Sequence, residues 1–128
     1  MTRAAMLTKG RVVGFVPTKD TVRARVFYEK LLGLSLLSED DFALVFDANG
    51  TNLRIVRVAS HTPAPFTILG WTVDDLRACA VQLQQNGVQF HRYGGLDQDD
   101  LGIWTAPGGA LVAWFSDPDG NVLSICEG

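Results

Sequence analysis

A hairpin pattern that occurs twice constrains the fold of this chain more than any other feature. An apolar run, a turn rich in Asp, Asn and Gly, and a second alternating run occur at 46–55 and again at 115–125. Asp and Asn hydrogen-bond to their own turns, and Gly accepts positive φ at no steric cost. Each copy therefore predicts two strands joined by a tight turn. Two copies in 128 residues indicate a duplicated module, so a functional site is expected where the halves meet.

A strand followed by an amphipathic helix precedes each hairpin. The strands are expected at 12–16 and 66–73. The first helix is expected at 21–32, with Gly33 as its stop, and the second begins after Asp74 or Asp75 and ends at Gly87. Apolar residues at helical spacing form one face of each helix. They are Ala24, Phe27, Tyr28 and Leu31 in the first helix, and Leu76, Cys79, Ala80 and Leu83 in the second.

The remaining predicted strands complete a β-α-β-β-β order in each half. They are 35–38, 42–47, 52–58, 88–93, 111–116 and 122–126. The predicted fold class is α+β, with two tandem βαβββ modules that make up one domain over 1–128. The first module covers 10–60 and the second 66–127. The second is longer because of an inserted loop at 94–109, which is bracketed by Gly-Gly pairs and is expected to carry a short extra strand around 103–105.

Composition excludes several classes of function. Apolar residues make up 47% of the chain, which is enough for a core, and the net charge of −3 with scattered basic residues does not favour nucleic acid or an anionic membrane. No apolar run approaches the ~20 residues that span a bilayer. The apolar stretch in residues 1–9 is too short for a signal peptide, and Cys79 and Cys126 lack metal-site spacing. A cytoplasmic protein with no membrane or nucleic-acid partner is expected.

The repeated module and three motifs resemble the vicinal oxygen chelate superfamily, which includes glyoxalase I, extradiol dioxygenases and bleomycin resistance proteins. The motifs are FYEKLLGL at 27–34, VDDL at 73–76 and DPDGN at 117–121. In that family each module forms a strongly curved mixed sheet, and two such sheets form a cup that is commonly closed by a second chain. The resemblance therefore implies a cup that binds a small-molecule ligand, in a homodimer.

Metal-dependent relatives hold a divalent ion at the floor of the cup, with one ligand from the first and one from the last strand of each module. Counting from the family motifs places these positions at Val13, Arg54, Ile68 and Ser124. Val and Ile have no donor atom, Arg stays a cation, and a neutral Ser hydroxyl is a poor ligand. The neighbouring positions offer no imidazole or carboxylate. We therefore expect no metal and no cofactor.

Residues two apart on a strand share a face, so the neighbours of the floor positions predict what lines the cup. Trp114 is placed inward by resemblance to fosfomycin resistance proteins. Arg54 has three open interpretations: it grips an anionic group of a ligand, pairs with an internal acid, or reaches the rim. Trp104 either closes over the pocket or is buried in a dimer interface. The predicted ligand-binding residues are Phe15, Arg54, Thr72, Trp104, Trp114 and Ser124.

His91 is a further candidate, because histidine titrates near neutral pH and can act as a general base. The sequence shows no partner for it, and the alternative is a surface histidine on a strand. Three functions stay open. The chain is a metal-free protein that binds an apolar or aromatic, anionic ligand; or a lyase, isomerase or dioxygenase-type enzyme of the same superfamily with an atypical or absent metal site; or an interaction module whose cup is filled by its own side chains. The identity of the ligand, and whether any reaction is catalysed, are not determined by the sequence.

Overall fold

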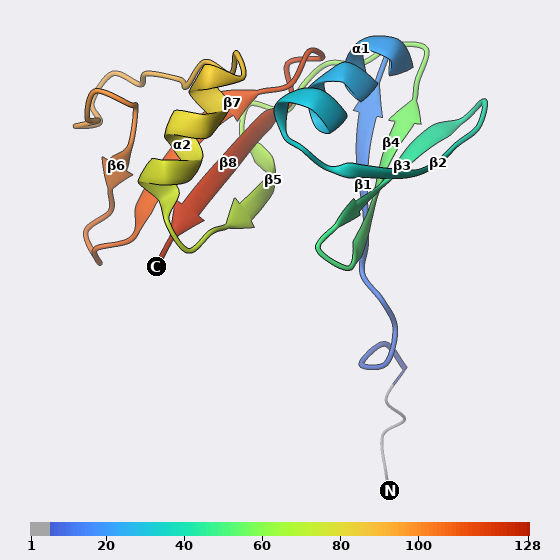
Figure 1. Ribbon diagram of the computed structural model, residues 1–128, viewed down its shortest axis with the longest axis horizontal. Coiled ribbons are helices and arrows are strands. Elements are labelled where there is room, and N and C mark those ends of the chain that lie inside the picture. Colours follow the sequence, from blue (N-terminus) through green and yellow to red (C-terminus); the bar gives the residue numbers. More distant parts are fainter. Residues whose placement is uncertain (1–5) are drawn as a thin grey trace, which may run out of the picture.

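The first half of the chain forms a four-stranded mixed sheet in the computed structural model, which describes residues 6–128 (Figure 1). Its strands follow the order β1-β4-β3-β2 across the sheet. β1 runs parallel to β4, and the other pairs are antiparallel. The strands are β1 Val13–Thr18, β2 Ser35–Glu39, β3 Ala43–Ala48 and β4 Thr51–Arg57.

The second half repeats this topology in a separate sheet, with the order β5-β8-β7-β6. β5 is parallel to β8, as β1 is to β4. The strands are β5 Thr67–Thr72, β6 Trp104–Thr105, β7 Leu111–Ser116 and β8 Val122–Glu127. The predicted α+β class with two tandem modules is confirmed. The sheets are curved and stand side by side without closing into a barrel (Figure 1).

Both helices begin behind an aspartate cap, which the sequence predicted for the second helix. Asp20 accepts hydrogen bonds from the backbone of Val22 and Arg23 ahead of α1 (Thr21–Arg25), and Asp75 caps α2 (Leu76–Gln85). The first helix differs from the prediction, because it continues past α1 as a π-helix, η1 (Val26–Leu31). The described residues contain no helix long and apolar enough to cross a membrane.

The predicted turn between β3 and β4 forms as expected. Asn49 and Gly50 adopt positive φ angles of 52° and 93°, the conformation of a tight hairpin turn. The Asp47 carboxylate accepts a hydrogen bond of 2.8 Å from the Gly50 backbone. This contact fixes the register in which Asp47 lies opposite Asn52.

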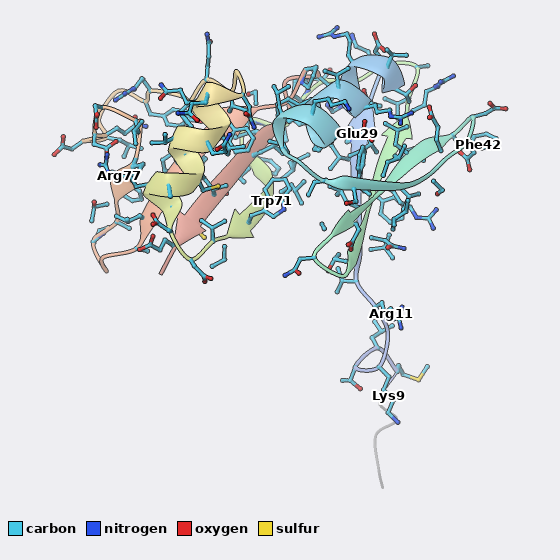
Figure 2. All side chains as sticks on the ribbon, in the orientation of Figure 1. Lys9, Arg11, Glu29, Phe42, Trp71 and Arg77 are labelled. Atoms are coloured by element: carbon cyan, nitrogen blue, oxygen red, sulfur yellow. The ribbon has the colours of Figure 1, made fainter. Side chains whose placement is uncertain are left out.

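The two modules pack through their helix-bearing faces. One apolar cluster contains buried residues of both modules, and it brings the Phe27 and Phe115 rings to 6.3 Å between centroids. Asn86, at the end of α2, donates to the Leu31 carbonyl at the end of η1. Trp71 projects between the modules (Figure 2) and packs on the core. The helix-free faces of both sheets therefore point outward.

The DPDGN turn between β7 and β8 ties the second module to the first. Asp117 is buried and accepts four hydrogen bonds, from Tyr28 Oη at 2.6 Å, Asn121 Nδ2 at 2.9 Å, and the backbone of Asp119 and Asn121. Asn121 also donates to the Pro17 carbonyl of β1. The motif that marks the fold in the sequence is thus the polar contact that holds the halves together.

The predicted strand at 88–93 is wrong. The structure has an extended segment there whose backbone makes one hydrogen bond to β7, from His91 to Trp114. The Gln98 side chain of the following loop bonds two more backbone groups: it accepts from the Tyr93 N–H and donates to the His91 carbonyl. The predicted extra strand in that loop forms as β6, which occupies the edge position of the sheet.

Candidate functional site

The outward face of the first sheet carries Phe15 and Arg54. The two residues lie opposite each other in the parallel pairing of β1 with β4. Their neighbours Val16 and Ile55 point to the opposite face and are buried in the core. Phe15 is 66% exposed, which is unusual for a large apolar side chain on a strand. This face therefore presents an exposed aromatic ring opposite a cationic side chain.

The Arg54 side chain makes no hydrogen bond or ion pair with any residue in the described range 6–128. The one acidic side chain whose pKa the Arg54 charge influences among these residues is Asp40. Backbone donors of Phe42 and Ala43 lower the pKa of the Asp40 carboxyl, and the Arg54 charge lowers it further as a smaller cause. The sequence left three interpretations of Arg54 open, and one of them, an internal ion pair, is not formed among these residues. The guanidinium therefore stays available to an anion.

The outward face of the second sheet carries Ser124 and Trp114, which lie opposite each other on β8 and β7. Gly70 of β5 is on the other side of Ser124, and a Cβ built on Gly70 would lie 2.7 Å from Ser124 Oγ. A larger residue at position 70 would displace the serine. Thr72, two residues on, contacts Cys126 Sγ at 3.4 Å.

Aromatic side chains form a wall on this second face, which we call the aromatic wall: Trp104, Trp114 and Tyr93. The Trp104 and Trp114 rings lie 6.0 Å apart, and Tyr93 meets Trp114 edge to face at 5.4 Å. Both geometries are favourable for aromatic pairs. Trp104 pairs with Val112, two residues before Trp114, so it shares the same face. The arrangement groups three aromatic rings, with Trp104 tilted by 34° and Tyr93 nearly perpendicular to Trp114.

The strand registers show the same internal repeat as the sequence. In the first sheet Arg54 lies between Phe15 and Val45, and in the second sheet Ser124 lies between Gly70 and Trp114. Arg54 and Ser124 therefore occupy equivalent positions on the last strand of each module. This is the equivalence that the duplicated hairpins predict.

The structure places the six predicted ligand-binding residues on outward faces but divides them into two groups. Phe15 and Arg54 are on the first sheet, whereas Thr72, Trp104, Trp114 and Ser124 are on the second. The modules pack through the opposite faces, and the curved sheets do not close on each other (Figure 1). A single chain therefore presents two half-sites, and the cup that the resemblance implies is not closed within it.

His91 has partners that the sequence does not reveal. Its Nε2 lies 2.9 Å from Ser116 Oγ, and its Nδ1 lies 3.0 Å from Tyr93 Oη. Alternation along 89–93 was a usable signal for Tyr93, since it puts His91 and Tyr93 on one side. Ser116, by contrast, comes from β7 and is near only in three dimensions. His91 and Ser116 also border a surface cavity of 410 Å³ whose other walls include Phe27 and Pro118.

The four floor positions do not fit a divalent metal. Val13 and Ile68 carry no donor atom, Arg54 is a cation, and Ser124 contributes one neutral hydroxyl. Within residues 6–128, no group of three His, Cys, Asp or Glu side chains is placed to hold a metal ion. The metal-dependent chemistry of the resembled family therefore has no ligand set at these positions.

Comparisons with known proteins agree with this architecture. A glyoxalase family protein from Bacillus anthracis matches 98% of this chain and 98% of its own, with a TM-score of 0.77 at 16% identity. A bleomycin resistance determinant encoded on the transposon Tn5 matches 91% and 96%, with a TM-score of 0.72 at 21% identity. An antibiotic binding protein from a Streptomyces species matches 95% and 98%, with a TM-score of 0.69 at 26% identity.

A comparison with curated proteins gives no match. The sequence profile of one family covers residues 10–125, nearly the whole chain. Together with the tandem modules, this match shows that the chain belongs to the Glyoxalase/Bleomycin resistance protein/Dioxygenase superfamily.

Proposed function

We propose that this protein binds an aromatic, anionic small molecule without a metal, in a cup that two copies of the chain form together. The first-sheet face of one copy lies opposite the second-sheet face of the other. Arg54 of one wall then faces the aromatic wall of the partner copy. The observation that carries the proposal is the division of the site into two outward faces, one cationic and one aromatic, that no single chain closes.

The chemistry of the two faces supports a ligand of this class. Planar apolar groups stack favourably on Trp and Tyr rings, and Trp104, Trp114 and Tyr93 are grouped for that contact. A guanidinium binds a carboxylate through paired hydrogen bonds, and Arg54 has no partner among the described residues that would compete. A mostly apolar site with a few polar anchors is the usual composition of a small-molecule site.

Two of the similar structures support binding without chemistry as the function. One is called a bleomycin resistance determinant and another an antibiotic binding protein. The second name states that a small molecule is bound, and the first names resistance to one. The absence of a ligand set at the floor positions agrees with a binding role, since a binding protein needs no metal there.

Cinnamate and its neutral amide, cinnamamide, test the role of Arg54. Both are planar, and they differ in one charge. Arg54→Met should weaken cinnamate binding by about ten- to a hundred-fold and leave cinnamamide unchanged, because a charge-assisted hydrogen bond contributes ~1.5–3 kcal/mol. Isothermal titration, with tryptophan fluorescence as a second signal, measures both. Treatment with EDTA should change neither affinity.

Arg57→Met is the matched control, because it removes the same charge from the same strand. Arg57 donates to Thr21 beside α1 and so faces away from Phe15 and Arg54. The Arg57→Met variant should bind cinnamate as tightly as the unmodified protein does. Equal losses for cinnamate and cinnamamide in Arg54→Met would make Arg54 a structural residue and contradict the proposed anchor.

An enzyme of the same superfamily is the second candidate, and the hydrogen-bonded chain Ser116–His91–Tyr93 is the observation that favours it. A histidine between two hydroxyl groups can accept and return a proton. Recovery of an aromatic carboxylate after prolonged incubation with the protein separates the two functions. Unchanged ligand supports binding alone, whereas conversion of many equivalents of ligand per chain supports an enzyme.

A further inference from the structure

A hydrogen-bonded chain borders the aromatic wall on the second sheet. Ser116 is two residues after Trp114 on β7, so both side chains lie on the outward face. His91 bridges Ser116 Oγ at 2.9 Å and Tyr93 Oη at 3.0 Å. Tyr93 meets the Trp114 ring edge to face and is 39% exposed. These three hydrogen-bonded side chains therefore begin at Ser116 on the sheet and end at the Tyr93 hydroxyl, beside the rings on which a planar ligand would stack.

With a neutral His91, the three side chains Ser116, His91 and Tyr93 have three donor hydrogens but share only two hydrogen bonds, so one donor is left without a partner. A neutral imidazole has one N–H and one acceptor nitrogen. When Nδ1 carries the proton, it donates to Tyr93 Oη, Ser116 donates to Nε2, and the Tyr93 hydroxyl hydrogen is free. When Nε2 carries the proton, Tyr93 donates to Nδ1, and the Ser116 hydroxyl hydrogen is free. A partner at Tyr93 can therefore select the tautomer of His91.

The surroundings place the free donor of the first tautomer at the ligand site. Tyr93 is held by its backbone N–H, which donates to Gln98, and by its ring contact with Trp114. Its hydroxyl has no partner other than His91 in the described residues. A hydroxyl that is fixed in place and backed by a histidine is a specific site for an oxygen atom of a ligand, because little side-chain freedom is lost on binding.

We propose that Ser116, His91 and Tyr93 form a polar subsite that recognises a hydroxyl or ether oxygen at the end of the aromatic ligand remote from its anionic group. The inference rests on the proposed function, in which Arg54 of the other copy binds the anionic group. Tyr93 donates to the ligand oxygen, His91 Nδ1–H donates to Tyr93, and Ser116 donates to His91 Nε2. The preferred ligand is thus an aromatic acid with an oxygen substituent on its ring.

Cinnamate and para-hydroxycinnamate test the subsite, because they share the carboxylate and the planar frame and differ in the ring oxygen. The protein should bind para-hydroxycinnamate about three- to ten-fold more tightly, the range that one net hydrogen bond supplies. Tyr93→Phe should remove this preference and leave cinnamate affinity unchanged. Arg54→Met should weaken both probes by the same factor. Nitrogen chemical shifts of His91 should move toward the Nδ1–H tautomer with para-hydroxycinnamate and not with cinnamate.

The outcomes separate the subsite from the site as a whole. Equal affinity of the unmodified protein for the two probes overturns the subsite and leaves the proposed function intact. A preference that persists in Tyr93→Phe also overturns it. If neither probe binds, the proposed aromatic-acid site fails, and the subsite fails with it. Because Tyr93 is exposed, Tyr93→Phe is expected to fold normally, which a thermal unfolding curve verifies.

Discussion

At the scale of single residues, Asp117 is the most consequential side chain outside the candidate site. It is buried, and its two oxygens accept all four hydrogen bonds described above. A carboxylate that serves only as an acceptor suits a set of four donors. Tyr28, one of these donors, comes from the first module, so the contact joins the two halves of the molecule.

Tyr28→Phe should lower the free energy of unfolding by about 1.5–3 kcal/mol at neutral pH, because the hydrogen bond is to a charged group. Asp117→Asn should cost more, since its amide nitrogen would face two donors that then lack an acceptor, at about 1–3 kcal/mol each. Urea unfolding measures both. A smaller loss in Asp117→Asn than in Tyr28→Phe would contradict the network as described.

The same hydroxyl makes stability depend on alkaline pH. Burial, and then the charge of Asp117, raises the pKa of Tyr28 above its ordinary value. Below pH ~10 the hydroxyl is protonated in both states, and above it the unfolded chain loses the proton while the folded chain keeps it. The stability advantage of the unmodified protein over Tyr28→Phe should therefore shrink above that pH, by about 1.4 kcal/mol per pH unit. An advantage that stays constant would show that the Tyr28 pKa is not raised.

Individual residues of the site were predictable where a strand register decided them, and not where a distant contact did. The internal repeat gives Arg54 and Ser124 equivalent positions on the last strand of each module, as the strand registers have them. Trp114, by contrast, was placed by the family resemblance and lies opposite Ser124. The partners of His91 depend on the segment around it running beside the end of β7, and no local pattern encodes that placement.

At the scale of elements, hairpins and helix starts were predictable because their signals are local. Asp75 caps α2, and Asn49 and Gly50 make the turn that their backbone preferences favour. The irregular structure of segment 88–93 was not predictable, since its apolar and polar residues alternate as in a strand. Arg92 donates to the carbonyls of Asp99 and Asp100, and Gln98 bonds to the backbone of His91 and Tyr93, on either side of Arg92. These side-chain hydrogen bonds stand in place of backbone bonds to a neighbouring strand.

Gln98 should therefore control the order of the loop between Tyr93 and β6. Its amide donates to the His91 and Gly102 carbonyls at 2.8 Å, and its oxygen accepts from the Tyr93 backbone at 2.7 Å. Gln98→Ala should speed hydrogen exchange at the Tyr93 amide, because that N–H loses its acceptor. Gln98→Glu keeps an acceptor and should preserve the protection of this amide while losing both donated bonds. Equal exchange rates in the two variants would show that Gln98 does not hold Tyr93.

At the scale of the whole molecule, two exposed aromatic side chains lie where a second copy would cover them in the proposed cup. Phe15 is 66% exposed, and Phe66 at the start of the second sheet is 65% exposed. The modules bury their other faces against each other, so nothing else in residues 6–128 covers these side chains. Large exposed apolar surface is costly in water and marks protein interfaces. How the two faces meet is a property of two chains, which the sequence of one does not specify.

We expect the protein to sediment at micromolar concentration with twice the 13.9 kDa mass of the chain. Phe66→Asp should shift it to the monomer without unfolding it, because this side chain is exposed in the single chain and a charge buried at an interface is costly. Val22→Asp is the matched control, since Val22 is 75% exposed on α1, which covers the opposite face of the first sheet. The dimer should survive that change. Loss of cinnamate binding should accompany dissociation in Phe66→Asp, since each half-site then lacks its opposite wall. A stable monomer that binds cinnamate as tightly as the unmodified protein would mean that one chain suffices for the site, and the shared cup would be wrong.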